Sequence, residues 1–369
     1  MKKILITTPA QWAAWSEQWN RLAQHNPMIS HDWLAAWWQT FGAGHQLHIL
    51  AIEHEGRLLA CLPTYLHSTK LGAELRWLGS GKVSSDYLSV LMAQHETDLA
   101  LHPMESLWEM LQDSLSQGVI SGWRGIRLEG MSQADPQIDT LHHRFGMRSD
   151  PLGNTWRIHL PETWQGFIDR VKKSHCYRKV KKVNQNIAAG KLTVRFLDTA
   201  EDADFGLETL IALHQLRRHD LGESGCFDDA RFVQFLTEAT HSMLNRGVAR
   251  FLVCQASDQP IGIQLQLLGN DTVFVYQCGM DPRALKLEPG HALVAIAVRT
   301  AIEQGYQNFD FLRGDEVYKA FWSAEPIPLV RVCGSVDSWK SRSLASLEKR
   351  VQWLKMLGRG DAREISTHQ

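Results

Sequence analysis

The segment at residues 308–322, NFDFLRGDEVYKAFW, gathers groups that can transfer protons and stabilise charge at the end of an alternating apolar strand. Its titratable side chains are Asp310, Arg313, Asp315, Glu316, Tyr318 and Lys319. A strand end that collects such groups is either a solvated turn or the rim of a site. The elements around it decide between these interpretations.

A second feature precedes this strand. The β-rich run DTVFVYQCG at residues 271–279 leads through a loop to a helix that begins near Gly290 and His291 and ends at Gly305. A glycine in the first turn lets a ligand approach the unpaired N–H groups, which together with the helix dipole favour a phosphate. A Pro-Gly pair is common in plain turns, but its position between two sheet strands favours an anion site.

Other motifs are incomplete. We interpret GSGK at residues 79–82 as a turn, because Arg76 stands where the first glycine of a phosphate loop belongs and Val83 replaces the Ser or Thr that holds magnesium. No G-x-G-x-x-G, G-x-S-x-G or H-E-x-x-H motif occurs. The histidine pairs lack companions at zinc spacing, so no metal site is expected.

The composition is that of a globular protein. A chain of 369 residues with 44% hydrophobic residues predicts two or three domains. With 39 Lys and Arg against 40 Asp and Glu, the net charge of −1 provides no broad field for nucleic acid or an anionic membrane. The six cysteines are scattered, which is typical of a reducing compartment, and no long apolar run occurs, so we expect a cytoplasmic protein.

Two stretches of the chain follow the same plan. Predicted hairpins at residues 48–66 and 250–268 are each preceded by helical patterns and followed by a strand, a helix and a strand. This repetition predicts a duplicated α/β fold with a mixed sheet. We place the domains at residues 1–150 and 151–338, followed by an amphipathic basic helix and tail at 339–369.

The order strand, EPGHAL, helix, NFDFLRGDEVYKAFW resembles the acyl-CoA-binding half of GNAT-superfamily acyltransferases. More narrowly, the sequence resembles the FemAB-like branch with tandem GNAT domains, which includes CelD-type proteins. Further matching segments are HDWLAAWWQTFG, SDYLSVL, FIDRVKKSHCYRKVKK, LHQLRR and YQCGMDP. The resemblance extends over nearly the whole chain.

This resemblance implies two tandem GNAT-like domains, with a degenerate site in the first and an acyl-CoA site in the second. The donor-binding residues that it implies are Tyr276, Cys278, Gly279, Gly290, His291 and Ala292. The last three would hold the pyrophosphate, and the first three would lie beside the thioester. The chain has Leu-Glu-Pro-Gly-His-Ala at residues 287–292 instead of the usual Arg/Gln-x-x-Gly-x-Gly/Ala loop, which puts acetyl-CoA itself in question.

The resemblance also implies the chemistry of the 308–322 segment. An amine that attacks a thioester must be neutral, the carbonyl oxygen must be polarised, and the leaving thiolate must gain a proton. Asp310 or Asp315 would take the amine proton. Tyr318 would protonate sulfur and Lys319 would stabilise the oxyanion, since a Phe/Tyr-Lys step in a similar place is associated with the reaction centre of Fem-type transferases.

Structural alternatives exist for these residues. Asp310 alternates with two phenylalanines and would then be exposed or paired with Arg313. Tyr318 and Trp322 are four residues apart and would pack together. The acceptor-binding residues that we predict are His214, Arg217, Arg313 and Trp322. His214 lies on an apolar helix face, which favours a buried histidine of the core or the cleft.

Residues 170–182 contain seven Lys or Arg and no acid, which is typical of a solvated helix face. The same run would suit the CoA 3′-phosphate, an anionic acceptor or a tRNA acceptor arm, since Fem-type relatives use aminoacyl-tRNA. The neutral overall charge argues against nucleic acid. The basic helix at 339–369 would either lie on a membrane or a partner, or pack on its own domain.

The sequence therefore predicts an N-acyltransferase that moves an acyl group from acyl-CoA to an amine of a small molecule or an envelope or exopolysaccharide precursor. Two alternatives stay open: an aminoacyl-tRNA-dependent Fem-type transferase, and a non-catalytic GNAT-like scaffold protein of polysaccharide biosynthesis.

Overall fold

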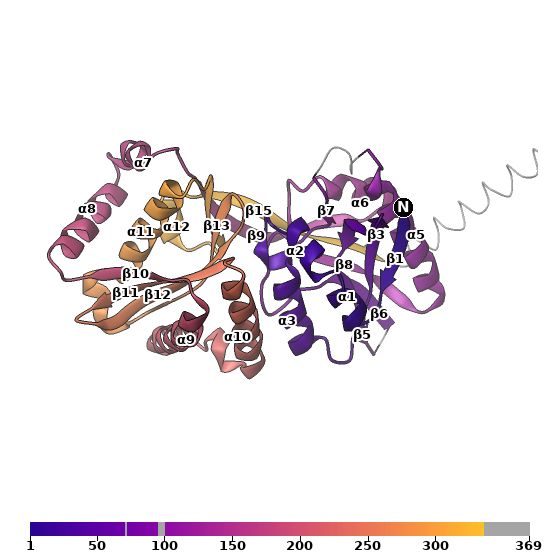
Figure 1. Cartoon of the computed structure of the whole chain (residues 1–369), viewed down its shortest axis with the longest axis horizontal. Helices are drawn as coiled ribbons and strands as arrows, with labels where there is room; N and C mark the ends of the chain where they lie inside the picture. The colour runs from indigo at the N-terminus through magenta and orange to yellow at the C-terminus, as the bar shows by residue number, and fades with distance from the viewer. Residues whose placement is uncertain (71, 95–99, 336–369) are drawn as a thin grey trace, which may run out of the picture.

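The computed structural model describes residues 1–70, 72–94 and 100–335 and shows two α/β halves side by side (Figure 1). The first half contains β1 (Lys2–Ile6), α1 (Pro9–Ala13), α2 (Ser16–Leu22), α3 (His31–Phe41), β2 (Gln46–Leu47), β3 (Ile49–His54), β4 (Arg57–Leu62), β5 (Thr64–Thr69), β6 (Gly72–Trp77), β7 (Leu91–Met92), α5 (Pro103–Ile120), β8 (Trp123–Ser132) and α6 (Gln137–Phe145). The remainder contains β9 (Arg148–His159), α7 (Trp164–Val171), α8 (His175–Ala188), β10 (Thr193–Leu197), α9 (Ala203–Asp220), α10 (Ala230–Asn245), β11 (Ala249–Ala256), β12 (Gln259–Leu268), β13 (Thr272–Met280), α11 (Pro289–Glu303), β14 (Asn308–Arg313), α12 (Val317–Phe321) and β15 (Glu325–Ser335).

The predicted repetition of one plan is confirmed. Strands β3 and β4 form an antiparallel hairpin in the first half, and β11 and β12 form one in the second. Each half also has a parallel strand pair joined by a helix, β6 with β8 through α5 and β13 with β14 through α11. The fold is thus a mixed α/β arrangement of two GNAT-like halves.

One sheet of eleven strands runs through both halves, in the order β10-β11-β12-β13-β14-β9-β15-β8-β6-β5-β2. Strand β9 pairs with both β14 and β15, and β15 pairs in turn with β8 of the first half. The predicted division at residue 150 therefore falls inside a strand at the centre of the common sheet. The predicted helix and tail at 339–369 lie outside the described residues.

Helices cover both faces of the sheet in the second half. Helices α9 and α10 lie on one face, and α7, α8 and α11 lie on the other (Figure 1). Helix α11 begins at Pro289, where a missing N–H costs no helical hydrogen bond. It ends before Gly305, whose φ of +83° suits a residue without a Cβ.

Aromatic side chains pack the first half against the second. The Trp33 ring of α3 lies 4.8 Å from the rings of Phe235 and Tyr276, edge to face in both cases. Its Nε1 donates to Ser85 Oγ at 2.9 Å, so the fully buried indole has its polar atom satisfied. Helix α3 is held against α10 and β13 by this packing.

Two buried carboxylates join the halves where β14 ends. Asp86 Oδ1 accepts from Arg313 Nε at 2.9 Å and from Nη2 at 2.6 Å, and its Oδ2 accepts from the Arg313 amide at 2.9 Å. Asp310 Oδ2 accepts from Arg157 Nε at 2.8 Å and from the Tyr87 hydroxyl at 2.6 Å. Both aspartates have no exposed surface, so their charges are stable only while these donors are in place.

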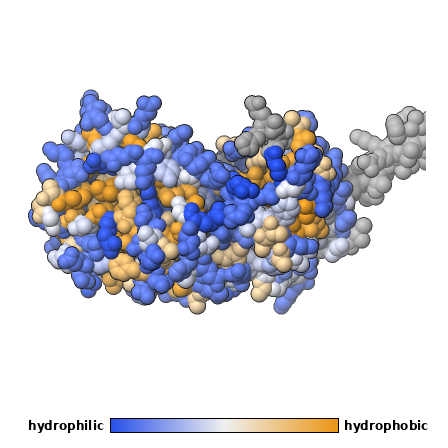
Figure 2. Space-filling view, in the orientation of Figure 1, coloured by the Kyte–Doolittle hydropathy of each residue, from blue (hydrophilic) through white to orange (hydrophobic). Residues whose placement is uncertain are grey.

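The surface shows no simple division by polarity. On the face in Figure 2, hydrophilic residues surround smaller hydrophobic patches in both halves. Across residues 1–70, 72–94 and 100–335, none of the helices has the length and apolar character needed to cross a membrane.

We expect Asp86→Ala to lower the free energy of unfolding by about 3 kcal/mol, because the half-buried Arg313 guanidinium would lose its carboxylate. Urea denaturation at neutral pH measures this loss. Asp169→Ala is the control, since Asp169 forms an exposed pair with Lys172 and its removal should cost about 0.5 kcal/mol or less. Equal losses in the two variants would contradict a structural role for the buried pair.

Candidate active site

The site is formed where β13 and β14 separate. The two strands pair only from Thr272 with Asn308 to Phe274 with Asp310. Beyond that point an apolar cavity of about 330 Å³ and a more polar cavity of about 430 Å³ lie beside the strands. They share four lining residues, Val275, Cys278, Phe311 and Tyr318. A molecule in one cavity can therefore meet a molecule in the other at this common wall.

The apolar cavity lies between β13, β14 and the start of α11. Its wall includes Met280, Leu285, His291, Leu293, Val294 and Trp322. The half-buried His291 ring lies 5.9 Å from that of Trp322, and burial lowers the pKa of this histidine. Apart from Glu288 at the start of α11, the cavity thus offers a mainly apolar surface, which suits an acyl chain.

Glu288 occupies the start of α11, where the sequence predicted an anion site. Its Oε1 accepts from Lys179 Nζ at 2.5 Å and lies 3.2 Å from Lys182 Nζ, both on α8. Burial works to raise the pKa of Glu288, but the two ammonium groups outweigh it and the pKa is lowered. The chain therefore places its own carboxylate at the positive end of this helix.

Two of the glycines predicted to bind the donor are closely packed by neighbouring atoms. A Cβ at Gly290 would lie 2.8 Å from Met280 Sδ, so the space beside this glycine is already filled. A Cβ at Gly279 would lie 2.6 Å from the His214 amide nitrogen, so this glycine lets α9 approach β13. The His291 and Ala292 amides donate to the Glu288 carbonyl oxygen at 3.1 and 3.2 Å. Of these, Gly290 and His291 line the apolar cavity.

The polar cavity lies between the two halves. Its titratable lining residues include Lys82 and Asp86 of the first half, together with His214, Arg218, Cys226 and Glu316 of the second. Lys82 also pairs with Asp229 at the start of α10. Sequence reasoning missed the first-half part of this wall, because Lys82 ends the GSGK segment interpreted as a plain turn and residues 83–86 follow it directly.

His214 is the buried base candidate of the polar cavity. Its Nδ1 lies 3.1 Å from Gln215 Oε1, and its Nε2 lies 3.7 Å from Cys226 Sγ. Burial lowers the pKa of His214, so the imidazole is neutral near pH 7 and able to accept a proton. Burial also raises the pKa of Cys226 to about 11, which keeps that thiol protonated.

Tyr318 stands in the wall between the cavities. Its ring contacts Phe311 edge to face at 5.6 Å, and its hydroxyl makes no hydrogen bond within the described part of the chain. Burial, with Cys278 and Glu316 nearby, raises the pKa of Tyr318. The phenol therefore keeps its proton and can donate it to a group bound in either cavity. The alternative of Tyr318 packing on Trp322 is not what the ring contacts show, since its partner is Phe311.

Lys319 also lines the polar cavity, but its ammonium group is hydrogen-bonded to backbone carbonyl oxygens. Nζ donates to the carbonyl oxygens of Leu312, Arg313 and Gly314 at 3.1, 3.0 and 2.9 Å, and Glu316 Oε2 lies 2.8 Å away. Three carbonyl acceptors match the three N–H bonds of an ammonium group. This geometry favours a structural role, and oxyanion stabilisation by Lys319 stays a prediction.

The two aspartates predicted as bases lie outside both cavities. Asp310 is neither exposed nor paired with Arg313, as the structural alternative supposed; its cationic partner is Arg157. Burial raises the pKa of Asp310, although Arg157 and the hydrogen bonds oppose the effect. Asp315 is exposed and accepts from Trp156 Nε1 at 2.9 Å, which lowers its pKa.

The remaining predicted residues are divided between the two cavities and the surface. Arg313 and Tyr276 line the polar cavity, and Trp322 lines the apolar one. The Tyr276 hydroxyl donates to the Val83 carbonyl at 2.8 Å and so ties β13 to the first half. Arg217 pairs with Asp220 at 2.8 Å on α9 and reaches neither cavity. No group of three or more His, Cys, Asp or Glu side chains among the described residues could hold a metal ion.

The splayed parallel strands with a helix crossover define a GNAT-type acyltransferase fold. Residues 172–320 match the family described as "Acetyltransferase (GNAT) domain". The match lies within the second half of the chain, and the resemblance predicted from its motifs is confirmed. No curated protein gives a significant match.

Solved structures show the fold of the whole chain. The crystal structure of FemX aligns with a TM-score of 0.62 at 11% identity, over 89% of this chain and 97% of that one. The C-terminal domain of a putative lysylphosphatidylglycerol synthetase from Agrobacterium fabrum has a TM-score of 0.54 at 9% identity, over 87% and 92% of the two chains. L-PGS from Bacillus licheniformis has a TM-score of 0.52 at 11% identity, over 88% and 91%. The chain therefore shares its overall fold with FemX over most of its length.

Replacing Lys319 with Met should lower the free energy of unfolding by about 2 kcal/mol, because three backbone carbonyls would lose a charged donor. Urea denaturation followed by intrinsic fluorescence gives the value, with Lys191→Met as an exposed control. An unchanged stability would mean that the ammonium group is free to act in chemistry.

Proposed function

We propose that the protein is an N-acyltransferase in which the apolar cavity holds the acyl group and the polar cavity holds an amine acceptor. The observation that carries this proposal is the wall common to both cavities, formed by Val275, Cys278, Phe311 and Tyr318. A carbonyl at this wall would face the acceptor while its chain lay in apolar surroundings. Such positioning contributes much of the rate in acyl transfer.

The chemistry assigns different tasks to the two cavities. The amine nitrogen forms a bond to the acyl carbonyl carbon, and the bond from that carbon to the leaving sulfur or oxygen breaks. The neutral His214 imidazole accepts the amine proton, directly or through water, and the Tyr318 phenol supplies a proton to the leaving group. The rim residues Lys82, Arg218 and Glu316 carry charge, which suits a polar acceptor such as a small amine or an amino sugar.

The residues at the start of α11 do not fit a CoA diphosphate. Glu288 presents a carboxylate there, Pro289 has no N–H, and the next free position is occupied by Met280. A diphosphate would have to compete with the Glu288 carboxylate for Lys179 and Lys182. The proposal therefore covers activated acyl donors in general and does not depend on a CoA nucleotide.

The basic residues on and before α8 favour a second candidate function, transfer from aminoacyl-tRNA. The exposed Lys172, Lys173, Arg178 and Lys181 lie on or just before α8, whose Lys179 and Lys182 reach the start of α11. A basic surface beside the donor cavity suits a phosphate backbone. The likeness to FemX supports the fold that this candidate requires.

The Tyr318→Phe variant should reduce kcat about 100-fold with little change in KM, because the leaving group would lose its proton donor. Transfer to a panel of amines is measured with thioester and aminoacyl-tRNA donors. Tyr65→Phe is the matched control, since Tyr65 lines neither cavity. An unchanged rate for Tyr318→Phe would reject the assigned role. Activity that ribonuclease abolishes would favour the tRNA donor, and no wild-type turnover with any donor would favour the scaffold alternative.

Wild-type protein should bind an acyl-pantetheine about as tightly as the matching acyl-CoA, because Glu288 excludes the diphosphate. Glu288→Gln frees Lys179 and Lys182, so its affinity for acyl-CoA should rise about tenfold relative to acyl-pantetheine. Calorimetric titration measures both ligands. Glu303→Gln at the other end of α11 is the control, since Glu303 forms an exposed pair with Arg299. A wild-type preference for acyl-CoA of tenfold or more would contradict the exclusion.

A further inference from the structure

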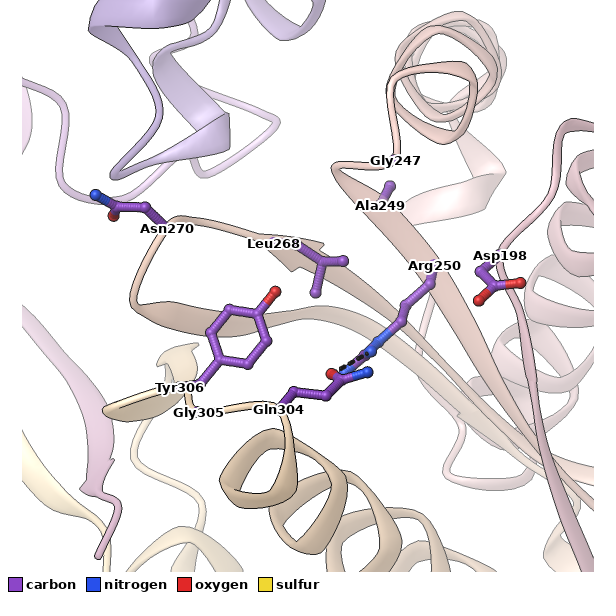
Figure 3. A pocket seen from close by; sticks show the side chains of 9 residues that line it. All are labelled: Asp198, Gly247, Ala249, Arg250, Leu268, Asn270, Gln304, Gly305 and Tyr306. Carbon is purple, nitrogen blue, oxygen red and sulfur yellow. Dashed lines mark hydrogen bonds between the residues drawn. The ribbon is translucent and has the colours of Figure 1, made fainter. Parts of the chain in front are cut away.

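A third cavity lies at the opposite end of α11 from the acyl cavity (Figure 3). It has a volume of about 410 Å³ and is lined by residues where several elements end, Asp198, Gly247, Ala249, Arg250, Leu268, Asn270, Gln304, Gly305 and Tyr306. Arg250 reaches it from β11, and Gln304 and Tyr306 reach it from the turn that follows α11 (Figure 3). None of these residues lines the cavities of the candidate active site.

Arg250 carries an uncompensated charge in this cavity. Its side chain is only 5% exposed, and it forms no ion pair with any described residue. Nε donates to Gln266 Oε1 at 2.7 Å and Nη1 to Gln304 Oε1 at 2.8 Å, so both acceptors are neutral amides. Nη2 is buried and has no partner. A buried cation with an unsatisfied donor is costly unless an anion completes its surroundings.

The protein itself does not supply that anion. One face of the guanidinium lies 4.3 Å from the centre of the Phe196 ring, which is a weak partner for a buried charge. The carbonyls of Thr300, Ala301 and Ile302 at the end of α11 accept from the chain's own amides. Asp198 also borders the cavity, and its charge works to raise the pKa of Arg250, but it is exposed, forms no ion pair with Arg250 and lies on the far side of Arg250 from Tyr306 (Figure 3).

Further hydrogen-bond donors line the same space. The Tyr306 hydroxyl makes no hydrogen bond within the described part of the chain, whereas the Asn270 side chain borders the cavity but points away from Arg250 (Figure 3). The Gln304 side chain uses only its oxygen, which leaves its NH₂ group available. An arginine with amide and phenol donors around it is a typical set for a carboxylate or phosphate.

We infer that this cavity is a binding site for a small molecule bearing one carboxylate or phosphate group, with Arg250 Nη2 as its central donor. The site is separate from acyl transfer and does not rest on the function proposed for the other cavities. The Asp198 carboxylate also borders the cavity, which favours a ligand with a single anionic group.

Thermal unfolding of the full chain in sodium phosphate, sodium acetate and sodium chloride of equal ionic strength tests the site. Phosphate or acetate should raise the midpoint in a saturable manner above chloride, and the stronger of the two identifies the kind of anion. Arg250→Met should lose this response and, in chloride, be at least as stable as the wild type, because a buried unpaired charge has been removed. Arg299→Met, an exposed arginine on the same helix, should keep the response.

Tyr306→Phe provides a second variant that preserves packing if Arg250→Met does not fold. It should weaken the apparent affinity for the effective anion by roughly threefold to tenfold, the value of one lost hydrogen bond. The inference is overturned if neither anion exceeds chloride, or if both variants respond as the wild type does.

Discussion

The structure depends on how two buried carboxylates fix the bend at the end of β14. Leu312 has a φ of +57°, a left-handed conformation that is costly for a residue with a branched side chain. Asp310 Oδ1 accepts from the Leu312 amide at 2.7 Å, and Asp86 of the first half accepts from the Arg313 amide at 2.9 Å. A carboxylate on each side of the bent residue therefore holds a backbone shape that the strand alone would not adopt.

The bend determines where the candidate active site can form. The pairing of β14 with β13 ends at Asp310, just before the bend, and β13 has a register shift between Val275 and Gln277. The cavities occupy the space beside the separated strands. The Lys319 ammonium group donates to the carbonyl oxygens of the next three residues, 312–314. These hydrogen bonds hold the neighbouring Tyr318 at the common wall. Asp86 comes from the first half, so the second half obtains its site geometry through contact with the first.

Sequence patterns were sufficient to predict the features of the fold that local periodicity controls. Alternation and turn residues identified the hairpins and both helix crossovers, and the 308–322 segment does form the rim of a cavity. They could not show that β15 passes between β9 and β8, since pairing across distant segments leaves no local signal. For the same reason the partner of Asp310 was misjudged: Arg157 is 153 positions away, whereas Arg313 is three. Asp86 and Tyr87 were quoted only as part of a matching segment, because nothing in their spacing indicates that they face β14.

The start of α11 shows how a shared fold can change its ligand chemistry without changing its backbone. In a helix whose first turn is open, the unpaired N–H groups and the dipole attract an external anion. Here Glu288 precedes the helix with a φ of +58°, and its carboxylate pairs with Lys179 and Lys182 without accepting a hydrogen bond from the first-turn N–H groups. A left-handed glutamate is unfavourable by itself, so the two lysines must offset this cost. Its Oε2 is buried without a partner, which shows that the arrangement is not optimised for hydrogen bonding alone. A locally unfavourable conformation is therefore held by charges from another helix, at a position where an ordinary serine or aspartate would cap the helix at lower cost.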